Sequence, residues 1–482
     1  MPERPSDPPF QEFPPPTPDP KALRRLADMD AGATLVVPDE PRNESPTGRG
    51  PAGAVLASLV MPGAPSFFRR RALSVALIFF GALVPLAAGL FAFLRRDRLA
   101  STFFDTKVLW TVQVAIALFV LARLVGVTEV IRSRRRGTPK RAATWLAVLG
   151  VLFVAVPAGW GGYRAYKLGD VIDDVFLSSG SSDPLADSGA GSGDGASEPE
   201  SDELFNVLLV GGDEGPGRWA LRTDTMILVS IHKPSGRIAM LSIPRNLRGV
   251  EFPADSPMGR EFPDGFPDLA NAIYPYVYTH EEMAAQYQRG ELSPEAVVLA
   301  QGLSYSLDVT IHDYVIVNMQ GFLEIVDALG GVTMTLDERI PMPGNVPGAK
   351  HSYPDSIGPG VVEMDGTIAL GFARSRSGDS DYGRMGRQRQ LLEALASQTS
   401  GSDVLVKFPD LANVLKFTVR TSLSTDEFGM LVDRMRAGAD IQESTGLGPP
   451  YINPGNPNLV DCVNLVDAMQ DAILTGVDFP YS

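Results

Sequence analysis

The fold is decided by three short runs rich in branched apolar residues, Phe205–Gly211 (FNVLLVG), Thr225–Ile231 (TMILVSI) and Arg237–Ile243 (RIAMLSI). Runs of this length and composition are typical of buried β-strands. The residues HKPSG between the second and third runs contain Pro and Gly, which favour a tight turn. The second and third predicted strands should therefore form a hairpin at the start of a β-sheet.

The sequence after this hairpin predicts helices interspersed with further strands. Apolar periodicity predicts helices at Pro267–Tyr276, His280–Arg289, Pro294–Leu307, Gln320–Leu329, Asp365–Phe372, Gly383–Ser397 and Thr425–Ala437. Two more short runs predict strands at His312–Asn318 and Gly331–Leu336. Such alternation predicts an α/β fold in which a mixed β-sheet is sandwiched by helices.

Three apolar stretches lie N-terminal to the first strand, at Ala72–Leu94, Leu109–Ile131 and Ala143–Tyr166. Each has 23 or 24 residues, and about 20 apolar residues are enough to cross the hydrocarbon core of a membrane as a helix. The second stretch contains Arg123 and Glu129 near its C-terminal end, where long side chains reach the membrane interface. We therefore expect three transmembrane helices.

The charge distribution predicts how these helices are oriented. The chain has a net charge of −15, but residues 61–141 carry fourteen Lys or Arg against three Asp or Glu, a net +11, which leaves −26 elsewhere. Arginines precede the first span, and the connector after the second reads RSRRRGTPKR. Basic connectors stay in the cytoplasm, so we expect a cell-membrane protein with a cytoplasmic N-terminus and everything after the third span outside the cytoplasm.

Composition divides the rest of the chain into further regions. The first twenty residues contain nine prolines, which predicts a disordered tail. The segment after the third span is rich in Ser, Gly and acidic residues, as expected for a flexible tether. The predicted regions are a tail at 1–71, a membrane anchor at 72–166, a tether at 167–203 and a folded extracytoplasmic domain at 204–482.

Several classes of function conflict with the composition. A single cysteine, Cys462, excludes an intramolecular disulfide and a thiolate zinc cluster. The four histidines are too far apart in sequence to form a local metal motif. An acidic total also argues against nucleic-acid binding. The run VGGDEGPG at Val210–Gly217 lacks the Lys-Ser/Thr ending of a P-loop, so it does not predict nucleotide triphosphate binding.

Acidic residues lie where two of the predicted strands meet. Asp213 follows the first strand, and Arg222, Asp224 and Thr225 lie at the start of the second. Two carboxylates at strand ends are suitable ligands for Mg²⁺, which binds one or two carboxylates together with phosphate oxygens and water. Ordinary turn and capping acids give the same spacing, so the pattern alone leaves both interpretations open.

A second candidate site is rich in arginine. Five arginines lie between Arg374 and Arg389, in the sequence ARSRSGDSDYGRMGRQRQ. The guanidinium group is a planar, permanently charged donor suited to phosphate. Arg384 and Gln388 are four residues apart and share a helix face, with Arg387 adjacent. The pattern indicates an anion site or a solvated helix face, and Arg245 in SIPRN is placed to join such a site.

Six segments together resemble the LytR-CpsA-Psr family in the order of its motifs. They are NVLLVGGDE, LRTDTMILVSI, MLSIPRN, LANAIYPY, DYVIVNMQGFLEIVDALGGV and MDGTIALGFARSRSGDSDYGRMGRQRQLLEAL. The resemblance implies a membrane-anchored transferase with an apolar pocket for a polyprenyl chain. It further implies a Mg²⁺-dependent phosphotransfer that moves a glycopolymer from a polyprenyl-pyrophosphate carrier to the 6-hydroxyl of N-acetylmuramic acid in peptidoglycan.

The resemblance also assigns roles to individual residues. It implies that Asp213 and Asp224 bind the metal and that Arg245, Arg374 and Arg376 are catalytic. The set implied to bind the substrate pyrophosphate is Arg222, Arg245, Arg374, Arg376, Asp381, Arg384 and Gln388.

One position departs from the family pattern. Asn246 stands where the family usually has an aspartate after the arginine of IPRD, and an amide cannot act as a general base. Two other functions therefore remain open. One is a pyrophosphatase, in which water attacks the same phosphate, and the other is a non-catalytic envelope binding or regulatory protein.

Overall fold

A computed structural model of the chain describes residues 203–212, 222–376, 380–399, 414–437, 440–452 and 459–477, with scattered positions among 108–163 and at 176, 407, 411 and 479. The predicted tail and the first predicted span lie outside the described residues, as do nearly all of the third span and the tether. Residues 113–121, within the second predicted span, are helical. In the described parts of the chain, no helix is both long enough and apolar enough to cross a membrane.

The described elements follow one another as strands and helices from residue 204 onward. In chain order they are β1 (Leu204–Gly212), β2 (Thr223–His232), β3 (Arg237–Ile243), α8 (Pro257–Glu261), η5 (Ala270–Ala272), α9 (Ile273–Thr279), α10 (Glu281–Tyr287), α11 (Pro294–Leu307), β4 (Asp313–Asn318), α12 (Met319–Leu329), β5 (Val332–Leu336), β6 (Ile340–Pro341), β7 (Ser356–Ile357), β8 (Gly360–Met364), α13 (Gly366–Arg374), α14 (Asp381–Gln398), β9 (Val419–Thr421), α16 (Thr425–Ala437), β10 (Asp440–Gly446) and α17 (Leu459–Thr475).

The central sheet has the strand order β10-β3-β2-β1-β4-β9. The β1–β2, β2–β3 and β4–β9 pairs are antiparallel, whereas β1–β4 and β3–β10 are parallel. The sheet is therefore mixed, as the sequence predicted, and the HKPSG turn joins β2 and β3 as a hairpin. Two small sheets, β5–β8 and β6–β7, lie outside it.

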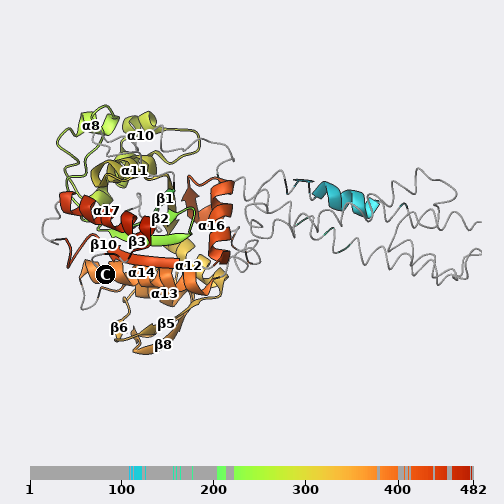
Figure 1. The fold of residues 1–482 in the computed structure, drawn as a ribbon. Helices are drawn as coiled ribbons and strands as arrows, with labels where there is room; N and C mark the ends of the chain where they lie inside the picture. The colour runs from blue at the N-terminus through green and yellow to red at the C-terminus, as the bar shows by residue number, and fades with distance from the viewer. Residues whose placement is uncertain are drawn as a thin grey trace, which may run out of the picture. The chain divides into compact units, whose positions relative to one another are not determined.

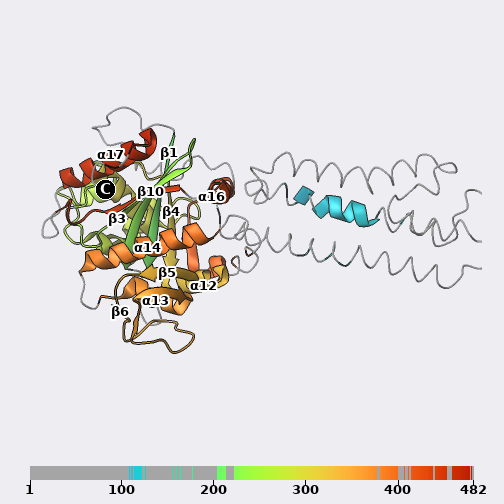
Figure 2. The same cartoon turned by 60° about the horizontal axis from the view of Figure 1, so that its bottom comes forward.

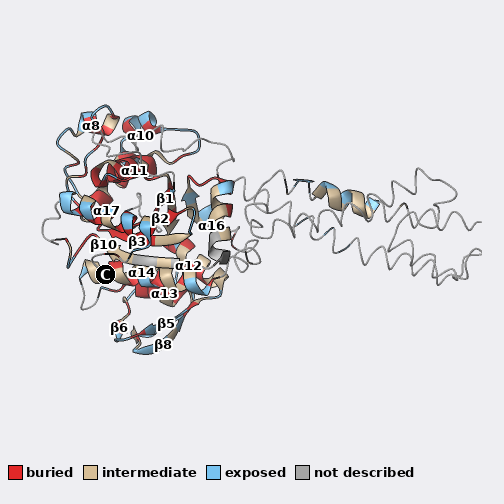
Figure 3. Cartoon of the chain, viewed as in Figure 1, coloured by how far each residue is buried: buried red, intermediate tan, exposed pale blue. Residues whose placement is uncertain are grey.

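Alternate residues of β1 face opposite sides of the central sheet. Leu204, Leu208 and Val210 pack into a core with α9, α11 and α17. Phe205 and Val207 face the other side and pack into a cluster with α16. Helices therefore cover both faces, with α11 and α17 on one side and α14 crossing the other (Figures 1 and 2). Nearly every residue of α11 is buried, as Figure 3 shows.

Helix α13 is held close to α12 by a glycine. A Cβ atom on Gly366 would lie 2.0 Å from the carbonyl oxygen of Leu323, so no larger residue fits without moving the backbone. Asp327 of α12 accepts a hydrogen bond from Gly366 N at 2.7 Å, and Asp365 caps the helix by accepting one from Ile368 N. These contacts fix the direction of α13, whose last residue is Arg374.

The predicted elements are confirmed within a few residues, with one exception. The helix predicted at Pro267–Tyr276 begins only at Ala270, as the short 3-10 turn η5 that leads into α9. The sequence analysis did not predict β8, β9, β10 or α17. β10 reads DIQESTG and is an edge strand of the described sheet, where polar residues are tolerated. α17 has buried residues at Cys462, Leu465, Val466, Met469 and Ile473, a helical spacing that was readable in the sequence.

Candidate functional site

Asp224 and Arg245 come from neighbouring strands of the central sheet. Asp224 is the second residue of β2, and Arg245 lies in the turn after β3. Because Met226 pairs with Ile243 across the hairpin, both residues lie at the same end of the two strands. The guanidinium Nη1 of Arg245 donates a hydrogen bond to Asp224 Oδ1 at 2.9 Å. The sheet register thus creates the first ion pair of the site.

The first turn of α14 supplies a second carboxylate and a second arginine. Ser380 caps this helix, and Asp381 occupies its first position, where a negative charge is favoured by the helix dipole. Arg245 Nε donates to Asp381 Oδ2 at 3.1 Å, so Arg245 bridges both aspartates. Arg384 Nη2 lies 3.1 Å from Asp381 Oδ1 and donates to the Asp224 carbonyl oxygen at 3.2 Å. Sheet and helix are thereby joined by one network of charged groups.

Asn271 was not among the predicted site residues, but it supports this network. Its backbone N–H donates to the carbonyl oxygen of Arg245 at 3.1 Å, and its Nδ2 lies 3.5 Å from Asp224 Oδ1. The residue is buried on η5. It stands in the quoted segment LANAIYPY, yet nothing local in that segment distinguishes it, because its contacts depend on how η5 packs beside β2.

The network carries more positive than negative charge. Arg376 lies just after α13, and its Nη2 is 3.9 Å from Asp224 Oδ2. Three arginines, Arg245, Arg376 and Arg384, therefore surround two aspartates. The Arg376 side chain is 51% exposed, whereas that of Arg384 is 4% exposed. The arrangement has an excess of cationic donors, one of which faces solvent, and is suited to an anion such as a phosphate.

The pKa shifts have clear physical causes. Burial alone would raise the pKa of Asp224, but the hydrogen bond from Arg245 and the charges of Arg245, Arg384 and Arg376 hold it below its ordinary value. Burial lowers the pKa of Arg384 to about 10, and the charges of Arg376 and Arg245 add to this effect against the opposing attraction of Asp381. Asp224 is thus a weak base, and Arg384 carries a charge that its surroundings disfavour.

Other side chains of α14 form hydrogen bonds with neighbouring segments of the chain. Gln388 Nε2 donates to the Ala373 carbonyl oxygen at 3.3 Å. Arg387 Nη2 donates to the Ser375 carbonyl oxygen at 2.7 Å, and Arg389 Nη1 donates to Ser242 Oγ at 2.8 Å. The bonds of Gln388 and Arg387 tie the segment that carries Arg376 to the helix, and the bond of Arg389 ties β3 to it. Gln388 therefore lies beside the site, where its hydrogen bond holds the end of α13 and does not join the charged network.

The remaining predicted residues are placed as follows. Arg374 is half-buried at the end of α13, two residues from Arg376. Arg222 lies exposed just before β2, and within the described residues no ion pair joins it to the network. Asp213 lies outside the described residues. The structure therefore brings together Asp224, Arg245, Arg376, Asp381 and Arg384.

The carboxylates at the site fit a metal ion that takes only one or two of its ligands from the protein. Asp224 is ionised, its Oδ1 is bonded to Arg245, and its Oδ2 has the 3.9 Å approach of Arg376. Among the described side chains, no group of three or more His, Cys, Asp or Glu is placed to hold a metal ion. This donor set fits Mg²⁺ held by one or two carboxylates, with water and substrate phosphate completing its shell, and does not form a cage of protein ligands.

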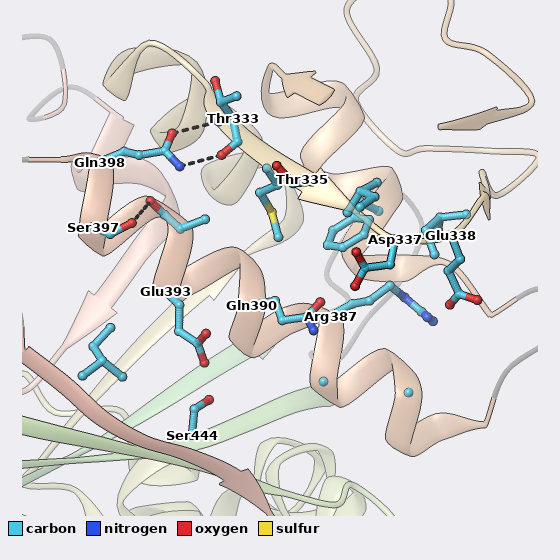
Figure 4. Close-up of a pocket in the computed structure, with 18 residues that line it drawn as sticks. Thr333, Thr335, Asp337, Glu338, Arg387, Gln390, Glu393, Ser397, Gln398 and Ser444 are labelled. Carbon is cyan, nitrogen blue, oxygen red and sulfur yellow. Dashed lines mark hydrogen bonds between the residues drawn. The ribbon is translucent and has the colours of Figure 1, made fainter. Parts of the chain in front are cut away.

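A large cavity lies beside the same helix. Its volume is about 1230 Å³, and its walls come from β5, from α14 and from β10. Figure 4 shows Gln398 and Thr333 at one end and Arg387 with Asp337 and Glu338 at the other. The lining combines polar and apolar side chains in similar measure, whereas the family resemblance implies an apolar pocket for the polyprenyl chain.

Comparisons with known proteins identify similar chains. The sequence profile of the LytR_cpsA_psr family matches residues 180–446. A protein from Oceanobacillus iheyensis, named polyisoprenyl-teichoic acid–peptidoglycan teichoic acid transferase TagU, is 32% identical over 232 residues, covering 48% of this chain and 62% of its own length. Biofilm regulatory protein A of Streptococcus mutans is 26% identical over 239 residues, covering 48% and 53%. The aligned regions thus span less than two thirds of either relative.

Among solved structures, that of TagV from B. subtilis is also similar. It covers 57% of this chain and 98% of its own, with 21% sequence identity and a TM-score of 0.42.

Proposed function

Because the chain belongs to the LytR_cpsA_psr family, we propose that it is a phosphotransferase that moves a glycopolymer from a polyprenyl-pyrophosphate carrier to peptidoglycan. The observation that carries this proposal is the network of Arg245, Arg376 and Arg384 around Asp224 and Asp381, with its excess of positive charge. A pyrophosphate diester presents concentrated negative charge, which such a network is suited to bind. The names of the transferase relatives agree with this class of reaction.

The arrangement of the side chains supports a division of roles. Arg376 is exposed and has only a distant contact with Asp224, so it is free to reach a phosphate oxygen. Arg384 is buried, and an anionic substrate would relieve the charge that its surroundings disfavour. Arg245 is fixed by both aspartates and orients them. As the substrate leaves its carrier, negative charge grows on the phosphate oxygens, and preorganised guanidinium groups stabilise that charge.

The weak basicity of Asp224 is compatible with this chemistry. Asp224 has a lowered pKa, and position 246 is an asparagine. Phosphoryl transfer through a loose transition state depends mainly on positioning and on electrostatic stabilisation, and little on deprotonation of the nucleophile. We propose that the attacking group is the 6-hydroxyl of N-acetylmuramic acid, held by the enzyme rather than strongly activated by it.

We propose Mg²⁺ as the cofactor, with Asp224 and Asp213 as its ligands. A bound Mg²⁺ would neutralise phosphate charge and polarise the bond that breaks. Asp224 contributes an ionised oxygen at the edge of the arginine network. The expected membrane anchor would place this site outside the cytoplasm, where peptidoglycan is assembled.

Replacement of Arg376 tests the proposed site. Arg376 is exposed at the site, so Arg376→Ala should leave the fold intact and lower transfer by about 10²–10³-fold, the usual cost of losing one such charge contact. The assay uses the purified full chain, a labelled lipid-linked glycopolymer, Mg²⁺ and peptidoglycan. Arg289→Ala is the matched control, because Arg289 is an exposed arginine outside the network whose bonds go to backbone carbonyls.

Product analysis separates the alternatives. A labelled adduct on peptidoglycan supports transfer, whereas free sugar phosphate without an adduct identifies a pyrophosphatase. Full transfer by the Arg376→Ala protein contradicts the assigned site.

A second candidate function is binding of a lipid pyrophosphate without turnover. The observation that favours it is the combination of Asn246 with an Asp224 that is held ionised by arginines, which leaves the described part of the site without a strong base. This function predicts retention of labelled polyprenyl pyrophosphate by the wild-type protein, with neither an adduct nor a released sugar phosphate in the same assay.

A further inference from the structure

The cavity beside α14 is lined by none of the side chains of the arginine network. Asp381 and Arg384 contact the end of the sheet, whereas Gln390, Glu393 and Ser397 line the cavity from the same helix. We call this cavity the α14 cleft. In Figure 4, α14 runs along its length, with the strand β5 on one side and Ser444 of β10 on the other.

One wall of the α14 cleft is the edge of β5 that faces away from its partner strand β8. The side-chain amide of Gln398 accepts from Thr333 N at 2.8 Å and donates to Thr333 O at 2.6 Å, so both backbone groups of Thr333 point away from β8 and toward α14. Backbone groups alternate in direction along an antiparallel strand, so those of Thr335 point to the same side. Gln398 closes one end of the cleft, and Thr335 offers a donor and an acceptor further along it.

The side chains that line the cleft suit a polyhydroxylated ligand. Thr333, Thr335, Ser397 and Ser444 offer hydroxyl groups, and Gln390 offers an amide. Each of these groups can donate and accept hydrogen bonds, as sugar hydroxyls and acetamido groups also can. The volume of about 1230 Å³ exceeds what a single small ligand requires and accommodates several sugar units.

The charge of the cleft selects against a phosphate-rich polymer. Asp337, Glu338 and Glu393 line it, against one arginine, Arg387, whose Nη2 is already bonded to Ser375 O. The lining is therefore net negative, the opposite of the arginine network. An anionic glycopolymer would be repelled from this cleft, whereas an uncharged sugar chain would not.

One end of the cleft lies at the start of α14. Gly383, Gly386 and Arg387 line it from the first two turns, which also carry Asp381 and Arg384. We propose that the α14 cleft binds the sugar backbone of the acceptor, an uncharged N-acetylated glycan strand, and directs it to the pyrophosphate site. The choice of the acceptor rests on the proposed function, whereas the preference for an uncharged glycan rests on the lining alone.

Gly386 offers a test that does not threaten the fold. A Cβ atom at this position would meet nothing within 4 Å, and the residue is in a helix interior. Gly386→Leu should therefore be tolerated, since most residues favour a helix more than glycine does, and its side chain would project into the cleft. Gly344→Leu is the matched control, because a Cβ there also meets open space but Gly344 does not line the cleft.

Binding to the full-length chain is measured by calorimetry with three probes. They are soluble peptidoglycan glycan strands, a neutral oligosaccharide without acetamido groups, and poly(glycerol phosphate). We expect the glycan strands to bind to the wild type and to Gly344→Leu, and to bind at least about ten-fold more weakly to Gly386→Leu, with an undiminished melting temperature. Equal binding to all three proteins, or tighter binding of the phosphate polymer that depends on Gly386, overturns the proposal.

The remaining outcomes also separate the two proposals. Binding of the neutral oligosaccharide alone would assign the cleft to a donor polymer and overturn the acceptor assignment. Gly386-dependent binding of glycan strands by a protein that forms no peptidoglycan adduct would uphold the cleft and reject the transferase. Formation of the peptidoglycan adduct at the wild-type rate by Gly386→Leu would uphold the transferase and reject the role of the cleft.

Discussion

The first two turns of α14 carry two kinds of arginine that differ in what they contact. Arg384 lies against Asp381 and the carbonyl oxygen of Asp224, in a network that has more arginines than aspartates. Arg387, three residues later, is also buried, and its Nη2 donates to the backbone oxygen of Ser375, which precedes Arg376. One arginine is part of a charged site with an excess of positive charge, and the other fixes a loop.

This difference shows that arginine content alone does not identify a binding residue. The five arginines between Arg374 and Arg389 look equivalent in sequence. In the structure, the surroundings disfavour the charge of Arg384 and lower its pKa to about 10. A binding site for an anion is where cationic charge is left incompletely neutralised, whereas Arg387 uses a donor to hold the Ser375 carbonyl oxygen in place.

The largest effect is expected for the role of Arg384 in stabilisation of the protein by a bound anion. Inorganic pyrophosphate at about 100 times its dissociation constant should raise the unfolding free energy of the wild type by about 2.7 kcal/mol. Arg384→Met should abolish most of this gain. Without the anion, the Arg384→Met substitution should lower the unfolding free energy only slightly, because the surroundings of Arg384 already disfavour its charge.

Thermal unfolding of the full chain with and without pyrophosphate measures both quantities. Arg289→Met, which changes an exposed arginine just after α10, should behave as the wild type. A gain of wild-type size in Arg384→Met would show that the anion binds elsewhere.

An intermediate effect is expected for Arg387. Ser375 is almost fully buried, and Arg387→Ala would leave its carbonyl oxygen without this donor. A buried polar group that loses its partner costs about 1–3 kcal/mol. The proposed transfer should fall as well, because Ser375 precedes Arg376 and the loop would no longer be held in place.

Urea unfolding of Arg387→Ala compared with Gln390→Ala tests this structural role. Gln390 is exposed on the same helix, and its loss should change stability by less than about 0.5 kcal/mol. Equal destabilisation by the two substitutions would remove the distinction between the two arginines. The distinction would also be removed if Arg387→Ala abolished the stabilisation by pyrophosphate without changing the unfolding free energy of the protein alone.

Much of the fold could be read from local patterns. The hairpin β2–β3 and the helix α11 lie where alternation, turn residues and apolar periodicity placed them. β10 could not be read, since an edge strand with the sequence DIQESTG is defined by pairing with β3 and by no apolar pattern of its own. The membrane spans rest on hydropathy and charge, and they remain predictions because they lie almost entirely outside the described residues.

The site was predictable in its residue types and less so in its geometry. The sequence grouped Asp224, Arg245, Asp381 and Arg384, which the structure brings together. It did not distinguish Gln388, whose amide bonds to the backbone at Ala373, from residues of the charged network. Helical spacing tells which side chains share a face, but only the packing of α14 against α13 decides what that face contacts.

The smallest effect is expected from the acid titration of Asp224. The pKa of this carboxyl is lowered in the folded protein, so its ionised form stabilises the fold. This contribution is complete above the unfolded pKa of about 3.9 and is lost as the pH falls through the lower folded value. Asp224→Asn should therefore be less stable than the wild type at pH 7, on the order of 1 kcal/mol for a partly exposed ion pair.

The difference between Asp224→Asn and the wild type should shrink as the pH falls below about 4. Urea unfolding at pH 7, 5, 4 and 3 measures it, with Asp264→Asn, an exposed aspartate away from the network, as the control for general acid effects. A difference that stays constant across this range would mean that the arginines do not hold Asp224 ionised. The contrast within α14 would then lose part of its electrostatic basis, because Arg384 would face one ionised carboxylate, that of Asp381, instead of two.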